Sequence, residues 1–230
     1  MNLAIMQPYF FPYLGYFQLI RAVDKFVFYD DVNFIKNGWI NRNRVLINNA
    51  PKYLTVQLKN ASPFKLINQV EFTDNRPKLL KTIQFAYKKA PYFTHVWPVI
   101  EDCLSVITDK VSELAIKSIT GVCAYLGLAL KYEKSSIGYS GTRNIPRTER
   151  ILTICEINKA QTYINPIGGM DLYSKAIFNV RGLELKFLKM EDVQYVQYGN
   201  AFIPELSIID VLMFNSRDTV REMLTQYRLV

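Results

Sequence analysis

The chain has 230 residues, of which 50% are hydrophobic and 13% aromatic, and it carries a formal net charge of +8. This apolar content is enough for a sizeable core and excludes extensive disorder, and no apolar run approaches the roughly 20 residues of a membrane-spanning helix. The first residues lack the features of a secretory signal peptide. We therefore expect a cytoplasmic protein without membrane insertion, folded as a single domain over residues 1–230.

Cysteine and histidine are too sparse for several kinds of site. The three cysteines, Cys103, Cys123 and Cys155, lie far apart in apolar surroundings, and this spacing argues against a disulfide framework or a zinc site. The single histidine, His95, limits histidine-based metal binding or catalysis to one residue. We expect the cysteines to be buried thiols and His95 to have a structural role.

Strand and helix patterns alternate over the first 32 residues of the chain. Residues 2–6 (NLAIM) predict a short buried strand, residues 13–23 carry apolar side chains at helical spacing, and residues 25–32 (KFVFYDDV) predict a second strand. A strand, a helix and a strand in so short a stretch indicate a βαβ unit with parallel strands. The predicted fold class is therefore α/β, with an open, mostly parallel sheet flanked by helices.

The middle of the chain predicts a helical insertion. Residues 52–59 and 66–73 alternate as strands do, and residues 76–87 and 106–126 have helical patterns. Residues 131–150 are polar and dotted with glycine, so they predict a loop.

The final third of the chain again predicts alternating helices and strands. The expected elements are a helix over 149–160, a strand–turn–helix unit over 160–178, a strand over 183–190 and two short C-terminal helices that meet at residues 215–216.

The segment QPYFFPYLGYF, residues 7–17, is a stiff aromatic turn after the first predicted strand. Its two prolines fix the backbone, and its glycine permits close approach to the start of the helix, where free amides favour a phosphate. In open α/β sheets ligands bind beyond the carboxyl ends of the strands, and tyrosine rings suit a base or a sugar. The alternative is a turn that only caps the core. The binding residues predicted in this segment are Gln7, Pro8, Tyr9, Tyr13, Gly15 and Tyr16.

Asp30 and Asp31 stand at the end of the second predicted strand. Adjacent residues of a strand point to opposite faces, so one of the two is expected to face the ligand. A carboxylate there can bind a ribose hydroxyl, hold Mg²⁺ or act as a general base. A helix cap or a partner for the basic loop that follows is the alternative. We predict Asp30 and Asp31 as the catalytic residues and leave the need for Mg²⁺ open.

Two further segments supply candidate binding residues. The basic loop after Asp31 combines cations, an indole and carboxamides that can cover a phosphate-bearing ligand, although solvated surface charge also explains it. The turn INPIGG, residues 164–169, places paired glycines after a later strand, where exposed amides can cradle an anion. The candidates in these segments are Lys36, Trp39, Asn41, Arg42, Arg44, Asn165, Gly168 and Gly169.

Four blocks of sequence resemble the WbqC-like family, bacterial proteins associated with O-antigen and other surface polysaccharides. The blocks are QPYFFPYLGYFQLI, YDDVNFIKNGWINRNR, ERILTICEINKAQTYINPIGG with DLY, and LSIIDVLMFN. The resemblance implies a Rossmann-like domain and modification of a nucleotide-linked sugar, for example N-acylation of an amino sugar. Tyr13-Leu14-Gly15-Tyr16 also resembles, in layout alone, the His-x-Gly-His motif of nucleotidyltransferases.

Our leading functional hypothesis is a transferase that binds a nucleotide-linked sugar or another phosphate-bearing small molecule. The alternatives are a nucleotidyltransferase-like enzyme that activates a carboxylate with ATP and a non-catalytic ligand-binding or assembly protein. Nucleic acid ranks last as a partner, because the chain has no run of basic residues. Two questions stay open: homo-oligomer formation, and closure of the Ser135–Arg150 segment over a ligand.

Overall fold

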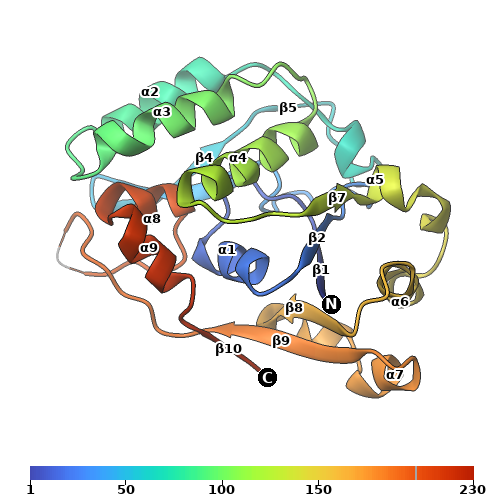
Figure 1. The fold of residues 1–230 in the computed structure, drawn as a ribbon. Helices are drawn as coiled ribbons and strands as arrows, with labels where there is room; N and C mark the ends of the chain where they lie inside the picture. Colours follow the sequence, from blue (N-terminus) through green and yellow to red (C-terminus); the bar gives the residue numbers. More distant parts are fainter. Residues whose placement is uncertain (200) are drawn as a thin grey trace.

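A six-stranded, mostly parallel sheet runs through the molecule (Figure 1). The computed structural model describes residues 1–199 and 201–230. The order of the strands is β10-β9-β8-β1-β2-β7, and only β10 is antiparallel to its neighbour. The strands are β1 (Asn2–Met6), β2 (Lys25–Phe28), β7 (Tyr132–Lys134), β8 (Thr162–Pro166), β9 (Glu184–Met190) and β10 (Tyr227–Leu229).

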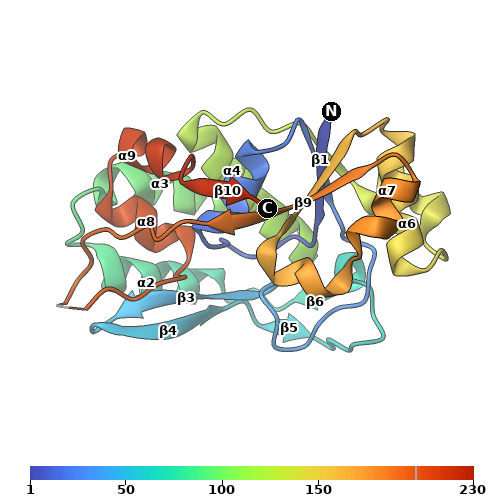
Figure 2. The ribbon, with the colours of Figure 1, turned by 90° about the horizontal axis from the view of Figure 1, so that it is seen from below.

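Helices cover both faces of this sheet, and short strands and 3₁₀ turns fill the connections. The α-helices are α1 (Leu14–Arg21), α2 (Arg76–Tyr87), α3 (Phe93–Leu104), α4 (Val111–Leu126), α5 (Ser135–Gly138), α6 (Arg147–Ile157), α7 (Lys175–Val180), α8 (Ile208–Phe214) and α9 (Arg217–Met223). The 3₁₀ turns are η1 (Ile67–Gln69), η2 (Ser140–Thr142) and η3 (Ile167–Leu172). The short strands are β3 (Arg42–Ile47), β4 (Ala50–Thr55), β5 (Leu58–Lys59) and β6 (Glu71–Phe72). Figure 2 shows the β3–β4 and β5–β6 pairs along one side of the molecule.

Alternation along the central strands divides the core between two faces. On β1, Ala4 joins the larger cluster, with α1, α4, α8 and α9, whereas Leu3 and Ile5 join the cluster around α6 and α7. On β2, Phe26 and Val27 divide in the same way. This period of two is what a parallel strand buried on both faces requires. The predicted α/β class, an open sheet flanked by helices, is confirmed.

The order of the strands follows the doubly wound pattern. Counted along the chain within this sheet, the strands lie in the order 3-2-1-4-5-6, which is that of dinucleotide-binding folds. From β1 the chain proceeds to β2 on one side, and from β8 it proceeds to β9 on the other. The gap between the carboxyl ends of β1 and β8 is therefore the topological switch point, where ligands bind in such sheets.

Several elements differ from the sequence prediction. Strands β3 and β10 were not predicted, and of the strand expected over 66–73 only Glu71–Phe72 is β6, because Ile67–Gln69 forms the 3₁₀ turn η1. The helix expected over 106–126 begins at Val111, because the backbone of residues 109–111 instead pairs with the β6 segment. Helix α3 was missed because an internal proline, Pro98, interrupts its helical pattern. Strand β7 was missed because it is only three residues long and lies at the edge of the sheet, with the sequence YEK. His95 lies exposed on α3, and the three cysteines are buried thiols as expected.

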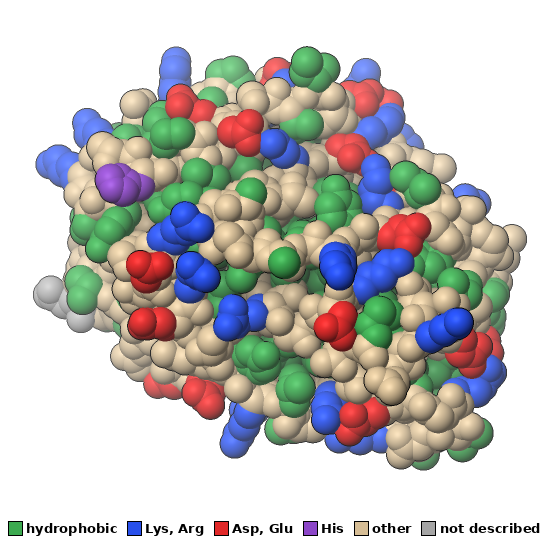
Figure 3. All heavy atoms as spheres, in the orientation of Figure 1, with side chains coloured by type: hydrophobic (Ala, Val, Ile, Leu, Met, Phe, Trp, Pro, Cys, Tyr) green, Lys and Arg blue, Asp and Glu red, His purple; other side chains and the backbone are tan. Residues whose placement is uncertain are grey.

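The described helices include none that is both long enough and apolar enough to cross a membrane. In Figure 3, Lys and Arg side chains are interspersed with Asp and Glu over the face shown. The basic side chains of this face therefore do not form one basic strip.

The turn after β1 is held in a strained conformation by buried side chains. Phe11 has a φ of 40° although it is not a glycine, a region that costs about 1–3 kcal/mol. Asn43 Nδ2 donates to the carbonyls of Phe11 at 2.7 Å and Phe10 at 3.3 Å. Ser207 Oγ donates to the Phe11 carbonyl at 2.7 Å, and the Phe11 amide donates to Ser118 Oγ at 2.9 Å. The turn is therefore fixed from β3, α4 and the start of α8.

We expect Asn43→Ala to lower the free energy of unfolding by about 1–3 kcal/mol, because it leaves the buried Phe10 carbonyl without this donor. Urea unfolding followed by circular dichroism measures the change. Asn179→Ala, at an exposed position of α7, is the control and should change stability by less than about 0.5 kcal/mol. Equal stability of the two variants would contradict this account of the turn.

Candidate functional site

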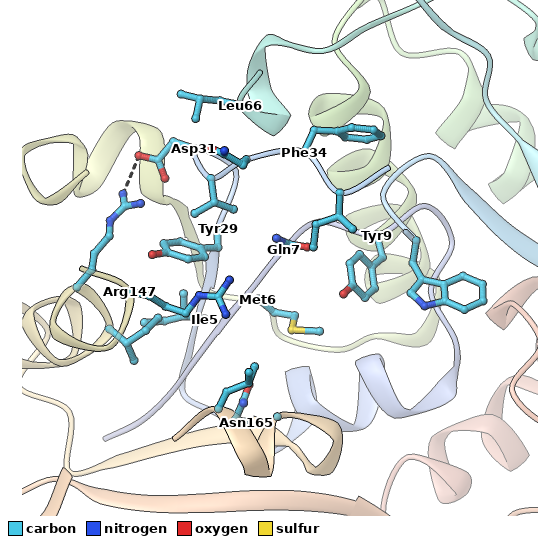
Figure 4. A pocket seen from close by; sticks show the side chains of 18 of the residues that line it. Ile5, Met6, Gln7, Tyr9, Tyr29, Asp31, Phe34, Leu66, Arg147 and Asn165 are labelled. Carbon is cyan, nitrogen blue, oxygen red and sulfur yellow. Dashed lines mark hydrogen bonds and ion pairs between the residues drawn. The ribbon is translucent and has the colours of Figure 1, made fainter. Parts of the chain in front are cut away.

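A cavity of about 1290 Å³ opens at the switch point, beyond the carboxyl ends of β1, β2 and β8. Gln7 reaches it from the end of β1, Asp31 from the segment after β2 and Asn165 from β8. Figure 4 shows these three residues around one pocket, with the Asp31 carboxylate turned toward its ion-pair partner. The fold thus brings together residues that are more than 150 positions apart in the chain.

Part of the predicted set lines this cavity. The residues in the lining are Gln7, Tyr9, Tyr13, Asp31, Lys36, Trp39, Asn165, Gly168 and Gly169. The predicted residues outside the lining are Pro8, Gly15, Tyr16, Asp30, Asn41, Arg42 and Arg44.

Within the turn after β1, the predicted residues that lie outside the lining contact, or make room for, the residues that lie in it. Tyr16 is buried, and its hydroxyl donates to the Gln7 carbonyl at 2.8 Å. A Cβ at Gly15 would lie 2.5 Å from the ring of Tyr13. This glycine therefore makes room for a tyrosine ring at the start of α1, where the sequence prediction placed a ligand.

The cations of the basic loop mostly anchor the loop itself. Arg42 donates to two carbonyls of residues 37–38, and its guanidinium lies 4.4 Å from the centre of the Tyr53 ring. Arg44 donates to the Glu205 carbonyl at 3.2 Å. Asn41 is buried and donates to a backbone carbonyl at 2.9 Å. Only Lys36 and Trp39 of this loop's candidates reach the cavity.

Asp30 holds the start of α5. It is buried, and its carboxylate accepts hydrogen bonds from the Ser136 amide at 2.9 Å and the Ser136 hydroxyl at 2.7 Å. The Ser135 hydroxyl donates to the same carboxylate at 3.2 Å. This is the helix cap that was the alternative role for Asp30 and Asp31.

The described residues contain no cluster of three or more His, Cys, Asp or Glu side chains that could hold a metal ion.

Asp31 forms a buried ion pair with Arg150. Arg150 Nη2 lies 2.7 Å from Asp31 Oδ2, and the side chains are only 2% and 3% exposed. The Ser135 hydroxyl also donates to Asp31, while Arg150 Nε donates to Thr142 Oγ1 at 3.0 Å. The guanidinium lies 4.7 Å from the centre of the Tyr29 ring. The pair thereby ties the end of β2 to α6 and orients a cation at the wall of the cavity.

Most of the positive charges in the lining come from the segment 131–150, for which the sequence predicts a loop. Arg143, Arg147 and Arg150 line the cavity, together with Lys36. Asp31 is the one carboxylate of the described lining, which leaves an excess of three positive charges. The spacing of four and three residues between the arginines was the available signal, because it matches one side of a helical segment.

Aromatic rings and carboxamides make up much of the remaining lining. The members that sequence analysis missed are Tyr29, Asn33, Asn144 and Tyr173. Burial raises the pKa of Tyr13 to about 12 and also raises the pKa values of Tyr9 and Tyr29. These hydroxyls are therefore protonated near neutral pH and can donate hydrogen bonds to an anionic ligand.

The fold and the cavity define a class: an α/β protein whose open sheet carries a positively charged cavity at its switch point. The chain belongs to the WbqC-like protein family, whose model matches residues 7–222. It is similar to the uncharacterized protein Rv1507c of Mycobacterium tuberculosis, with 27% identity over 223 residues that span 93% of each chain. No solved structure gives a significant match. The family assignment made from the sequence is thus confirmed.

We expect Asp31→Asn to destabilise the fold by about 3–5 kcal/mol, because it leaves the Arg150 charge buried without its partner. The double variant Asp31→Leu/Arg150→Met should recover most of this loss, since apolar residues can replace a buried pair at little cost. Urea unfolding of both variants measures the difference.

Glu156→Gln is the control, because it removes one partner of an exposed ion pair with Arg181 and should have little effect. If Asp31→Asn is no more destabilising than Glu156→Gln, the buried pair does not stabilise the fold as described.

Proposed function

We propose that the protein is a transferase that modifies a nucleotide-linked amino sugar, for example by N-acylation, in the synthesis of a bacterial surface polysaccharide such as O-antigen. The reaction would take place in the cavity at the switch point. In such a transfer the sugar amine bonds to the acyl carbon, the bond from that carbon to the leaving group breaks, and the leaving group departs with the bonding electrons and takes up the proton that the amine gives up. Family membership supports this proposal.

The observation that carries the proposal is the charge and size of the cavity. Four cations and one carboxylate line about 1290 Å³, and an excess of cations favours a phosphate-bearing ligand. The volume exceeds the 300–1,000 Å³ of ordinary small-molecule pockets. It therefore suits a ligand as large as a sugar nucleotide, or a donor and an acceptor bound together.

In this proposal, positioning and electrostatic stabilisation provide the catalysis. Asp30 and Asp31 were the predicted catalytic residues, but their carboxylates already accept hydrogen bonds from Ser135, Ser136 and Arg150. We therefore propose that Asp31 orients Arg150 toward the ligand. The same engagement of both carboxylates favours a second candidate, a ligand-binding protein of the same pathway without turnover.

Thermal unfolding with a panel of ligands tests the proposal. The panel contains ATP, CTP, UDP- and dTDP-linked sugars and acyl-CoAs, each with and without Mg²⁺. A sugar nucleotide at 100 times its Kd should stabilise the fold by about 2.7 kcal/mol and raise Tm by roughly 5–10 °C. Free UDP and the free sugar are the matched controls for the two halves of the ligand.

Turnover then separates the candidate functions. Transfer of an acyl group to the stabilising amino-sugar nucleotide, followed by mass spectrometry, is the result that the transferase predicts. Stabilisation by ATP alone, with pyrophosphate release that depends on a carboxylic acid, would instead indicate the activating enzyme. If the sugar nucleotide binds but is not acylated by any of the acyl donors, the ligand-binding protein is the remaining candidate.

A further inference from the structure

The cavity has two chemically different sides. The segment 143–150 contributes arginines, whereas the turn after β1 contributes tyrosine rings at Tyr9 and Tyr13 and no cation among its described residues. Figure 4 shows Arg147 beside Tyr29 on one side of Gln7 and Tyr9 on the other side. Trp39 belongs to the aromatic side, since its carbonyl accepts a hydrogen bond from the Phe10 amide at 3.0 Å.

The start of α1 is poorly arranged for a phosphate. In a doubly wound sheet this first turn is the usual phosphate site, but here the ring of Tyr13 packs against Gly15. The nearest polar groups from this turn in the lining are Gln7 and the two tyrosines. A phosphate placed there would have no cation from the turn itself.

The start of α6 has cations beside it, which the start of α1 lacks. Neither helix has a side-chain cap at its first turn, but the first residue of α6 is Arg147, whereas α1 begins with Leu14. Glu149, the acidic residue of that turn, lies 2.5 Å from Arg181 and is not part of the lining. The free backbone amides of this turn therefore lie next to cations of the cavity wall, a combination that favours an anion.

Arg150 gives an independent indication of an anion at this end. Its side chain is 2% exposed, and its Nη2 and Nε atoms donate to Asp31 and Thr142. The side chain also belongs to the lining of the cavity, and its guanidinium lies 4.7 Å from the centre of the Tyr29 ring. A guanidinium that these contacts hold in the cavity wall favours an oxyanion ligand.

Resting on the proposed function, we infer that the ligand is a nucleoside diphosphate derivative whose diphosphate binds Arg143, Arg147 and Arg150 at the start of α6. Its base stacks on the aromatic side formed by Tyr9, Tyr13 and Trp39. The diphosphate thus binds at the third βα connection of the sheet, and the conventional position at the first one is taken by aromatic rings. Asp31 acts as a positioning residue through Arg150.

Calorimetric titration with inorganic pyrophosphate tests the position of the diphosphate. Arg143→Gln/Arg147→Gln should weaken binding about 10- to 100-fold, because each change removes a charge-assisted hydrogen bond. Arg21→Gln/Arg228→Gln is the matched control: it removes the same charge at exposed positions outside the lining and should change the affinity less than about twofold. Circular dichroism checks that all the variants are folded.

Trp39→Ala tests the aromatic side, with UDP as the probe. It should lower UDP affinity about 10-fold, since stacking of a base on an aromatic ring has that magnitude, and leave pyrophosphate affinity unchanged. Pyrophosphate thus serves as the internal control for this variant.

The inference is overturned if pyrophosphate does not bind the wild-type protein or if both double variants weaken it equally. It is also overturned if Trp39→Ala leaves UDP affinity unchanged. A failure of the proposed function looks different: pyrophosphate and UDP bind as described, but no nucleotide-linked amino sugar binds or is modified. Conversely, if Arg143→Gln/Arg147→Gln still acylates the sugar nucleotide with an unchanged KM for it, the inferred diphosphate site is wrong and the transferase proposal stands.

Discussion

The buried ion pair between Asp31 and Arg150 is the constraint on which the site depends. It joins the end of β2 to α6 across a distance of 119 positions in the chain. Because both charges are almost wholly removed from water, neither can leave the pair without a large desolvation cost. Because Arg150 lies in the first turn of α6 and also donates to Thr142, the pair holds this turn and the segment before it at the cavity, where Arg143 and Arg147 lie.

The opposite wall is fixed by neutral groups. Residues 7–13 adopt a strained turn whose carbonyls are held by Asn43 and Ser207. These anchors come from β3 and from the start of α8, so the hairpin insertion and the C-terminal helices both support the position of the aromatic rings. A rigid aromatic side and a rigid cationic side face each other across the carboxyl ends of β1 and β8, and this preorganisation lowers the cost of ordering a ligand.

Local patterns predicted the strands β1, β2, β8 and β9 and the turn after β1, but neither the edge strands β7 and β10 nor the cationic side of the cavity. Apolar periodicity identified β1, α1 and β2, because each buries a regular stripe of side chains. Which of Asp30 and Asp31 lines the cavity depends on α5 and α6, elements that a local pattern does not place. For the same reason Arg42 and Arg44 were ranked as ligand clamps, whereas their actual partners are backbone carbonyls and the ring of Tyr53. The polar segment 131–150 has no apolar period, so its arginines were predicted only as part of a loop.

A crystal structure with 5-bromouridine diphosphate tests the orientation of a ligand in the cavity most directly. The anomalous signal of bromine locates the base independently of the diphosphate density. We expect a bromine peak beside Tyr9 and Trp39, with the diphosphate against Arg147 at the start of α6. A bromine peak beside Arg147 with the diphosphate at the start of α1, or a ligand bound outside the cavity, would contradict it.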